Sequence, residues 1–130
     1  MTGLYYGLAL LGNVAVREGD YVRAASLYSE SLAGYQRCGD TSGVIATLDR
    51  YARLFAAGGQ LVSAVRLFGA AEALREAGGF GVDTWERDDR ERLVGWLRRT
   101  VGTEIFREAW TAGRAMTLSR ALTEVNSVNW

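Results

Sequence analysis

The chain has 130 residues, of which 48% are hydrophobic and 23% charged, and its 15 basic residues balance 15 acidic ones. This composition predicts one soluble, globular domain (1–130) with its own core, no membrane span and no basic surface for direct nucleic-acid binding. Histidine is absent and Cys38 is the one cysteine, which excludes histidine-based triads, ordinary zinc sites and an internal disulfide within this chain, and favours a cytoplasmic location.

Apolar residues recur at intervals of three and four throughout the sequence, and proline is absent. This period predicts an all-α fold, and glycines divide the pattern into helix-sized segments. The predicted helices cover residues 4–18, 20–37, 41–57, 60–77, 84–101, 103–113 and 117–127. Asp20 and Thr103 are expected to act as N-caps, and DTWE at 83–86 has the pattern of a capping box.

The first predicted helix, within GLYYGLALLGNVAV at 3–16, is apolar on more than one face. One face is expected to pack inward, and it consists of Tyr5, Leu8, Leu11 and Gly12. A helix that is apolar all round is normally buried on all sides, so the second face needs a cover. Upstream repeats of a longer chain or a second copy in a homo-oligomer would supply it. The candidate self-association residues are Tyr6, Leu10 and Val14.

An internal repeat follows. The segment GDYVRAASLYSESLAGY at 19–35 returns forty residues later as GQLVSAVRLFGAAEALR at 59–75, with Ala24 superposed on Ala64 and Tyr28 on Phe68. The small residues would let two antiparallel helices approach closely, and the aromatic residue would fill the space between that pair and the next. The sequence therefore predicts two helical hairpins, at 1–38 and 41–78.

The order of large and small positions in each copy resembles the tetratricopeptide repeat. In the first copy these positions are Leu8, Leu11, Gly12, Ala15, Ala24, Tyr28 and Ser31. The period of forty exceeds the family's period of about 34, so the surplus residues would lengthen the helices or the turn at 37–43. The resemblance implies a right-handed α-α superhelix, with residues 83–130 forming a degenerate hairpin and C-terminal capping helices.

The second half adds a further resemblance. LVSAVRLFGAAEALREAGG at 61–79 and VGTEIFREAWTAGRAMTLSRAL at 101–122 resemble the C-terminal repeat region of large bacterial ATPase and LuxR-type transcriptional regulators. The matching positions near the end are Phe106, Ala109, Trp110, Gly113, Arg114, Leu118, Ala121 and Leu122. This resemblance implies a regulatory scaffold and no chemistry within this chain. Trp96, Phe106 and Trp110 are expected to form the core of the cap, with Trp110 largely buried.

In the repeat fold that the chain resembles, the first helix of each hairpin lines a concave face. The candidate peptide-groove residues are Tyr6, Asn13, Arg17, Asp49, Arg50 and Arg53. The arginines could hold a peptide carboxylate by charge-assisted hydrogen bonds. The alternative is a solvated polar helix face with an Asp49–Arg53 ion pair. The acidic run DTWERDDRER at 83–92 could suggest a metal site, but the helix dipole and interleaved arginines account for it better.

These features predict a non-catalytic protein–protein interaction or regulatory scaffold module that binds a protein or peptide partner. No catalytic residue, metal or cofactor is assigned, and a Walker A loop is excluded because the chain has no lysine. The alternative is a small-molecule effector-sensing domain, with an apolar pocket between repeat and cap near Trp96 and Trp110. A polar groove along the first helices would favour the peptide, and an apolar cavity lined by the aromatic residues would favour the effector.

Overall fold

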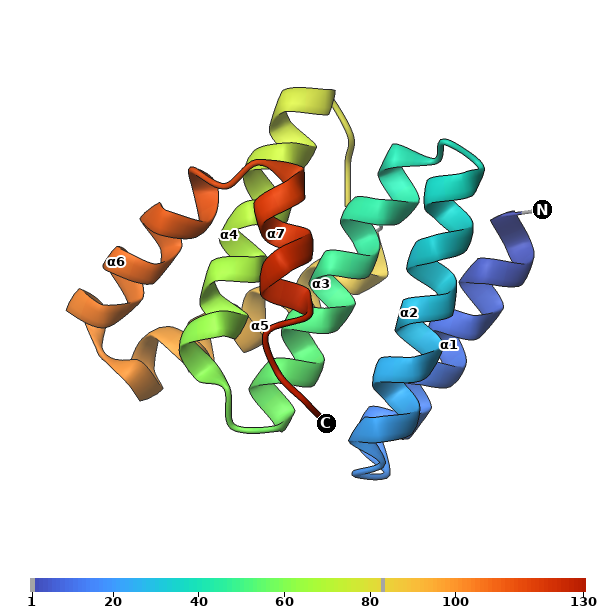
Figure 1. Cartoon of the computed structure of the whole chain (residues 1–130). Helices are drawn as coiled ribbons and strands as arrows, with labels where there is room; N and C mark the ends of the chain where they lie inside the picture. The colour runs from blue at the N-terminus through green and yellow to red at the C-terminus, as the bar shows by residue number, and fades with distance from the viewer. Residues whose placement is uncertain (1, 83) are drawn as a thin grey trace.

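The computed structural model describes residues 2–82 and 84–130, and these form seven α-helices with no strand among them (Figure 1). The predicted all-α fold is confirmed. The helices are α1 (Thr2–Arg17), α2 (Tyr21–Arg37), α3 (Thr41–Ala57), α4 (Leu61–Gly78), α5 (Thr84–Val101), α6 (Thr103–Arg114) and α7 (Leu118–Val125). Each predicted helix is present, with ends displaced by at most two residues. No helix in this described part of the chain is long and apolar enough to cross a bilayer.

The helix starts depend on capping residues. The Asp20 side chain accepts a hydrogen bond from the Arg23 backbone N–H at 3.2 Å, which confirms its predicted role. The predicted cap Thr103 is wrong, because Gly102 occupies the N-cap position of α6 with a φ of 93° and Thr103 lies in the first turn. That φ favours glycine, so the cap carries no side chain here. Asp83 of the predicted capping box lies outside the described residues.

Four turns of the same kind set the length of the first four helices. Each turn has a glycine with positive φ, and these glycines lie twenty residues apart: Gly19, Gly39, Gly59 and Gly79. A left-handed residue after the last helical turn ends a helix and satisfies its last carbonyl groups. Two such helix-and-turn units make the forty-residue period seen in the sequence.

The first four helices form two antiparallel pairs, α1 with α2 and α3 with α4, and α2 packs against α3 between them (Figure 1). Ala24 and Ala64 are fully buried, as are Tyr28 and Phe68. The Tyr28 ring lies edge-on to Tyr51 of α3 at 5.5 Å, so it fills the space between the two pairs as predicted.

The inward face of α1 differs from the prediction at one position. Leu11 is 50% exposed, whereas Ala9 is fully buried. The crossing of α1 and α2 is too tight for a large residue, because a Cβ on Gly12 would lie 2.5 Å from the Tyr28 ring. Tyr5 does pack inward, with its ring edge-on to Tyr35 at 5.8 Å.

Helix α6 packs along α4, at the edge of the molecule away from α1 (Figure 1). Glycine makes this approach possible, because a Cβ on Gly113 would lie 2.1 Å from the Arg66 carbonyl oxygen. Phe106 of α6 is buried as predicted, and Trp110 is half-buried and stacks on it at 5.5 Å, so its burial is only partial. Trp96 of α5 is 43% exposed, so its predicted place in the core is wrong.

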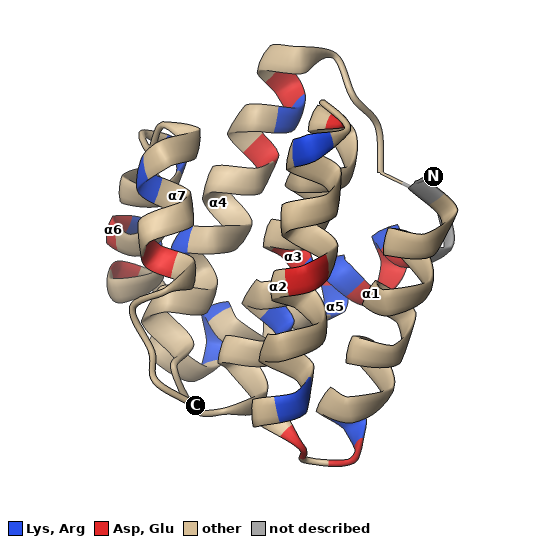
Figure 2. Ribbon diagram, turned by 45° about the vertical axis from the view of Figure 1, so that its right-hand side comes forward, with Lys and Arg blue, Asp and Glu red and all other residues tan. Residues whose placement is uncertain are grey.

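Helix α7 packs on α4 and α3, and the chain end returns to the C-terminal end of α3. There the Trp130 ring lies edge-on to Phe55 at 5.4 Å and to Tyr21 at 6.0 Å. Basic and acidic residues are interleaved along the helices in the view of Figure 2. The arrangement leaves α1, α3 and α5 on a common face, and the candidate site lies there.

Candidate functional site

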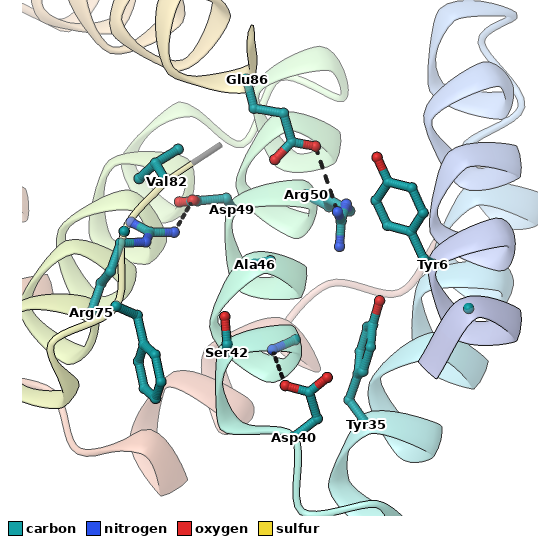
Figure 3. Close-up of a pocket in the computed structure, with 14 residues that line it drawn as sticks. Tyr6, Tyr35, Asp40, Ser42, Ala46, Asp49, Arg50, Arg75, Val82 and Glu86 are labelled. Carbon is teal, nitrogen blue, oxygen red and sulfur yellow. Dashed lines mark hydrogen bonds and ion pairs between the residues drawn. The ribbon is translucent and has the colours of Figure 1, made fainter. Parts of the chain in front are cut away.

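Two hollows open on the face formed by α1, α3 and α5. The first, which we call the arginine pocket, has a volume of about 290 Å³ and is closed by the end of α2, the end of α4 and residues 80–82 (Figure 3). Its polar lining residues are Tyr6, Tyr35, Asp40, Ser42, Asp49, Arg50, Arg75 and Glu86. The pocket thus brings together side chains from five helices.

Arg50 projects from α3 into this pocket and is only 5% exposed. Its Nε and Nη1 atoms are buried and have no hydrogen-bond acceptor among the described residues. Its Nη2 atom lies 3.6 Å from a Glu86 carboxylate oxygen, which is an ion pair beyond ordinary hydrogen-bond distance. The Tyr6 ring covers the guanidinium, with its centroid 5.6 Å from the Arg50 Cζ atom. Arg50 is therefore a buried cation with unused donors.

Tyr35 and the start of α3 complete the polar wall. The Tyr35 side chain points along the pocket toward Arg50 (Figure 3). Burial raises the pKa of Tyr35, although the nearby Arg50 charge acts in the opposite direction, so its hydroxyl stays protonated and can donate. Asp40 accepts a hydrogen bond from the Gly43 backbone N–H at 2.9 Å and so caps α3. The wall therefore offers hydroxyl donors beside the Arg50 cation.

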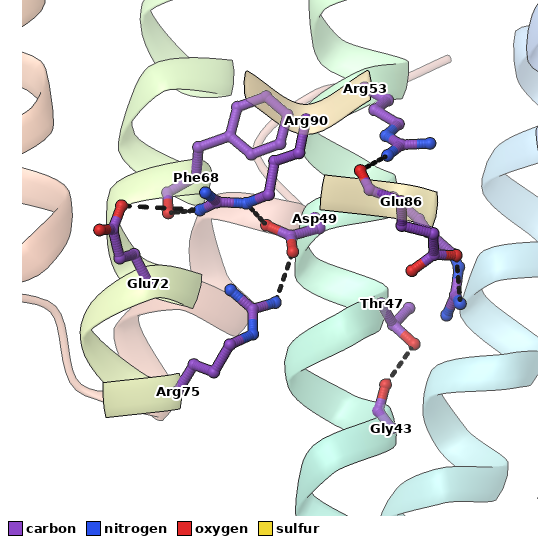
Figure 4. Close-up of polar contacts among 10 residues, drawn as sticks. Gly43, Thr47, Asp49, Arg53, Phe68, Glu72, Arg75, Glu86 and Arg90 are labelled. Carbon is purple, nitrogen blue, oxygen red and sulfur yellow. Dashed lines mark hydrogen bonds and ion pairs between the residues drawn. The ribbon is translucent and has the colours of Figure 1, made fainter. Parts of the chain in front are cut away.

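Asp49 lies on the opposite wall, and arginines from two other helices engage it (Figure 4). Arg75 of α4 donates to one carboxylate oxygen at 2.5 Å, and Arg90 of α5 donates to the other at 3.2 Å. Arg90 also donates to the Phe68 carbonyl oxygen at 3.0 Å. Asp49 is therefore a structural residue that fixes α5 on α3 and α4. The alternative Asp49–Arg53 ion pair is wrong, because these two arginines occupy the carboxylate instead.

The other predicted groove residues lie apart from this pocket. Asn13 is half-buried and accepts a hydrogen bond from the Tyr28 hydroxyl at 2.5 Å, so it supports the α1–α2 crossing. Arg17 is exposed at the end of α1. Arg53 donates to the Glu86 carbonyl oxygen at 3.5 Å and lines the second hollow. Of the six predicted residues, the structure brings Tyr6, Asp49 and Arg50 into one site.

Sequence reasoning missed five of the polar residues that line the arginine pocket, which are Tyr35, Asp40, Ser42, Arg75 and Glu86. Tyr35 lies on the second helix of its hairpin, where the repeat pattern assigns packing positions. Ser42 follows a helix cap and has no distinguishing pattern. Glu86 belongs to the acidic run at 83–92, which the helix dipole and the interleaved arginines were sufficient to explain. For Glu86 a signal was present, since an acidic residue in a first helical turn can face a neighbouring helix.

The second hollow, which we call the Trp96 hollow, has a volume of about 560 Å³ and lies between α1, α3 and α5. Its lining residues are Val16, Arg53, Ala56, Ala57, Asp89, Arg92, Leu93 and Trp96. The side chains of Val16, Leu93 and Trp96 make its wall mainly apolar, and its charged lining residues are Arg53, Asp89 and Arg92. The alternative prediction placed an apolar pocket near Trp96 and Trp110, and Trp96 lines this hollow whereas Trp110 is not among its lining residues.

Metal binding has no candidate site, since no three His, Cys, Asp or Glu side chains converge among residues 2–82 and 84–130. Within the acidic run, Glu86 pairs with Arg50 and Asp89 with Arg92. Comparison of the chain with protein-family models, with curated proteins and with solved structures finds no match. The geometry of the two hollows is thus the basis for a functional proposal.

Proposed function

We propose that this chain is a non-catalytic interaction module that binds an acidic segment of a protein partner on the face formed by α1, α3 and α5. The observation that carries the proposal is that Arg50 has buried N–H donors without an acceptor. A guanidinium has five N–H donors and no acceptor, and it matches the geometry of a carboxylate. In this structure the Nε and Nη1 donors of Arg50 are buried without an acceptor among the described residues.

A buried donor without an acceptor costs about 1–3 kcal/mol, and more when the group is charged. A carboxylate that enters the pocket would recover part of this free energy, because charge-assisted hydrogen bonds are stronger than neutral ones. Glu86 is an incomplete internal substitute, since its carboxylate lies 3.6 Å from one Arg50 nitrogen. The free protein is therefore held in a state that an acidic ligand would stabilise.

The other charged groups of the pocket support a binding role over catalysis. Asp49 is engaged by two arginines, and Asp40 caps α3. Burial keeps the Tyr35 hydroxyl protonated by raising its pKa, which is unfavourable for a general base or nucleophile. These residues are suited to holding a ligand rather than transforming it.

The proposal also includes the repeat architecture of the chain and its association with other copies or repeats. Two helical hairpins of nearly equal length, with alanines at their crossings, support a tetratricopeptide-like superhelix. We propose on the same grounds a cytoplasmic regulatory scaffold related to bacterial transcriptional regulators. Leu10 and Val14, each 39% exposed on α1, form the face that a second copy or upstream repeats would cover. Tyr6, the third residue expected there, lies over Arg50 instead.

Equilibrium binding of a short acidic peptide tests the proposal. The probe is N-acetyl-Ser-Glu-Ser amide, which has no terminal carboxylate, and its glutamine analogue is the matched control. We expect calorimetry to detect the glutamate peptide and not the analogue, and Arg50→Met to abolish the difference. Arg107→Met, a change at an exposed arginine on α6, should leave binding intact. Equal binding of both peptides, or an unchanged Arg50→Met protein, would refute the proposed function.

The Trp96 hollow favours a second candidate function, the sensing of an apolar small molecule. Its wall is mainly apolar, and Trp96 offers an aromatic surface that is 43% exposed. Naphthalene is a suitable probe, detected through ligand-observed NMR, with Trp96→Ala as the variant. Saturable binding that disappears in Trp96→Ala, together with no response to the glutamate peptide, would favour this function over the first.

A further inference from the structure

We infer that a second copy of this chain covers the outer face of α1, in a two-fold contact in which the two α1 helices run antiparallel. The inference rests on the part of the proposed function that concerns α1, and it commits that part to one occupant and one arrangement. The face is a line of outward residues that we call the α1 stripe: Leu4, Gly7, Leu10, Leu11 and Val14. Its leucine and valine side chains are 39% to 59% exposed, so the stripe is an apolar surface without a cover among the described residues.

The internal repeat shows that the equivalent stripe of the second hairpin is buried. Forty residues along the chain, the α1 stripe corresponds to five residues of α3, none of them more than 5% exposed: Val44, Thr47, Arg50, Tyr51 and Leu54. Helix α2 covers Tyr51, since the Tyr28 ring lies edge-on to it at 5.5 Å. This surface of the repeat is therefore suited to helix packing, and on α1 it faces solvent.

The charge pattern favours a second copy as the occupant. Residues 1–16 contain no charged side chain, and the positions that correspond to Arg50 and Arg53 of α3 are Leu10 and Asn13 on α1. In a two-fold contact a side chain near the axis meets its own copy, so a charge there would be repelled by the same charge. The first charged side chains, Arg17 and Glu18, lie beyond the stripe and offset each other. Helix α1 thus lacks charge where two copies would meet.

The opposite end of the molecule is closed to a second copy. Helices α6 and α7 pack on α4 and cover the outer side of the second hairpin, whereas α1 lies at the far edge (Figure 1). The α1 stripe of one copy therefore cannot stack head-to-tail on α4 of another. A contact between two α1 stripes remains, and it closes on itself as a dimer.

An antiparallel arrangement makes the stripe complementary to itself. Four of its residues follow intervals of three, four and three, the spacing of a packed helix seam: Leu4, Gly7, Leu11 and Val14. In the antiparallel pair Leu11 lies opposite Gly7 of the partner subunit. Leu4 then lies opposite Val14 of the partner subunit, because both pairs share one midpoint on the helix. A Cβ added to Gly7 would meet no atom within 4 Å among the described residues, so the space that receives Leu11 is open.

A parallel arrangement fits less well, and either contact is small. Parallel helices would place Gly7 against Gly7 of the partner subunit, which leaves that space unfilled, and would align the two helix dipoles in the same direction. Helix α1 has 16 residues, so the two helices are in contact over about 24 Å. Such a contact buries less than about 1,200 Å², the size of weak and transient complexes. We therefore expect a reversible dimer that forms at high micromolar concentration.

Sedimentation velocity at increasing protein concentration tests the association. We expect the unmodified chain to shift from monomer to dimer between low and high micromolar concentration. Leu11→Arg should raise the dissociation constant at least about tenfold, because it brings an unpaired charge into an apolar contact. Ile105→Arg on α6 is the matched control and should leave the constant unchanged, since Leu11 and Ile105 are each 50% exposed. The measurement on the unmodified chain stands even if a variant fails to fold.

Disulfide crosslinking tests the antiparallel arrangement, in a Cys38→Ser background because Cys38 is exposed. Positions 4 and 14 are separated by about 15 Å along the helix, and a disulfide needs Cα atoms within about 7 Å of each other. A chain that carries both Leu4→Cys and Val14→Cys should therefore form covalent dimers under mild oxidation. Leu4→Cys alone and Val14→Cys alone should not, because each thiol would face an apolar side chain of the partner.

The outcomes separate the inference from ligand binding at Arg50. A chain that stays monomeric at high micromolar concentration would overturn the inference, and binding of the glutamate peptide at Arg50 would still stand. Equal effects of Leu11→Arg and Ile105→Arg would also overturn it, since the dimer would then use another face. Covalent dimers of Leu4→Cys alone would show parallel helices and overturn the arrangement. Crosslinking as expected without any peptide binding would support the inference and refute the binding role of Arg50.

Discussion

Replacing Arg50 with methionine should stabilise the free protein. Methionine keeps the unbranched stem of the side chain and removes the buried Nε and Nη1 donors that have no acceptor among the described residues. Replacing a buried ion pair by apolar residues of similar volume is often neutral or stabilising by about 1–4 kcal/mol, and here the carboxylate that remains, Glu86, has a side chain that is 21% exposed and can be solvated. The change also removes the loose Glu86 ion pair and the Tyr6 contact, worth about 0.5–2 kcal/mol.

The net expectation is a gain of about 1–2 kcal/mol, or a rise in Tm of roughly 3–8 °C for a chain of this size. Urea denaturation followed by circular dichroism measures it. Arg75→Met is the matched control, because Arg75 is also buried but donates to Asp49 at 2.5 Å. That variant should lose about 1–3 kcal/mol, since it removes a satisfied partner from a buried carboxylate. A loss in Arg50→Met equal to that in Arg75→Met would refute the reasoning.

Three further predictions concern packing, pH and association. Gly113→Ala should lower stability by about 1–3 kcal/mol in thermal denaturation, because its Cβ would meet the Arg66 carbonyl oxygen at 2.1 Å and backbone atoms yield little; unchanged stability would contradict the close packing of α6 on α4. Burial raises the pKa of Tyr51 to about 12. The free energy of unfolding should therefore fall as the pH rises from about 10 to about 12, by up to about 1.4 kcal/mol per pH unit. Urea denaturation at a series of pH values should show a shallower fall for Tyr51→Phe. Glutamate at Leu10 and Val14 should turn a sedimenting dimer into a monomer, and a wild-type monomer at high micromolar concentration would exclude self-association through this face.

The sequence predicted the helices well because local signals fix them. Glycines at a spacing of twenty residues end each of the first four helices, and this signal does not depend on tertiary contacts. The burial of Ala24 and Tyr28 was predictable for a related reason, since the repeat requires small and large residues at set positions. Such features depend on residues within one hairpin or between two adjacent ones.

The errors came from contacts that no local pattern encodes. Leu11 and Ala9 differ by two positions on one helix, and the tight crossing at Gly12 decides which of them faces α2. Trp96 lies on α5, whose placement depends on Arg90 binding Asp49 across 41 residues of sequence. The sequence alone could not show which face of α5 packs inward, because the placement of this helix depends on that ion pair.

The candidate site was predicted only in part for the same reason. Arg50 and Arg53 lie one helical turn apart and have the same charge, so the sequence grouped them. The structure distinguishes them through Glu86, whose carboxylate pairs with one and whose carbonyl oxygen accepts from the other. Which arginine keeps unused donors is therefore a property of the α3–α5 contact.

The resonance of the Arg50 Nε–H group is the most direct test of the binding role assigned to this residue. It can be followed in a ¹⁵N-labelled sample while N-acetyl-Ser-Glu-Ser amide is added. Capture of the carboxylate predicts a saturable downfield shift at Arg50, absent for Arg107 and absent when the peptide contains glutamine. An Arg50 resonance that stays in place throughout the titration, or moves equally with the glutamine peptide, would contradict the account.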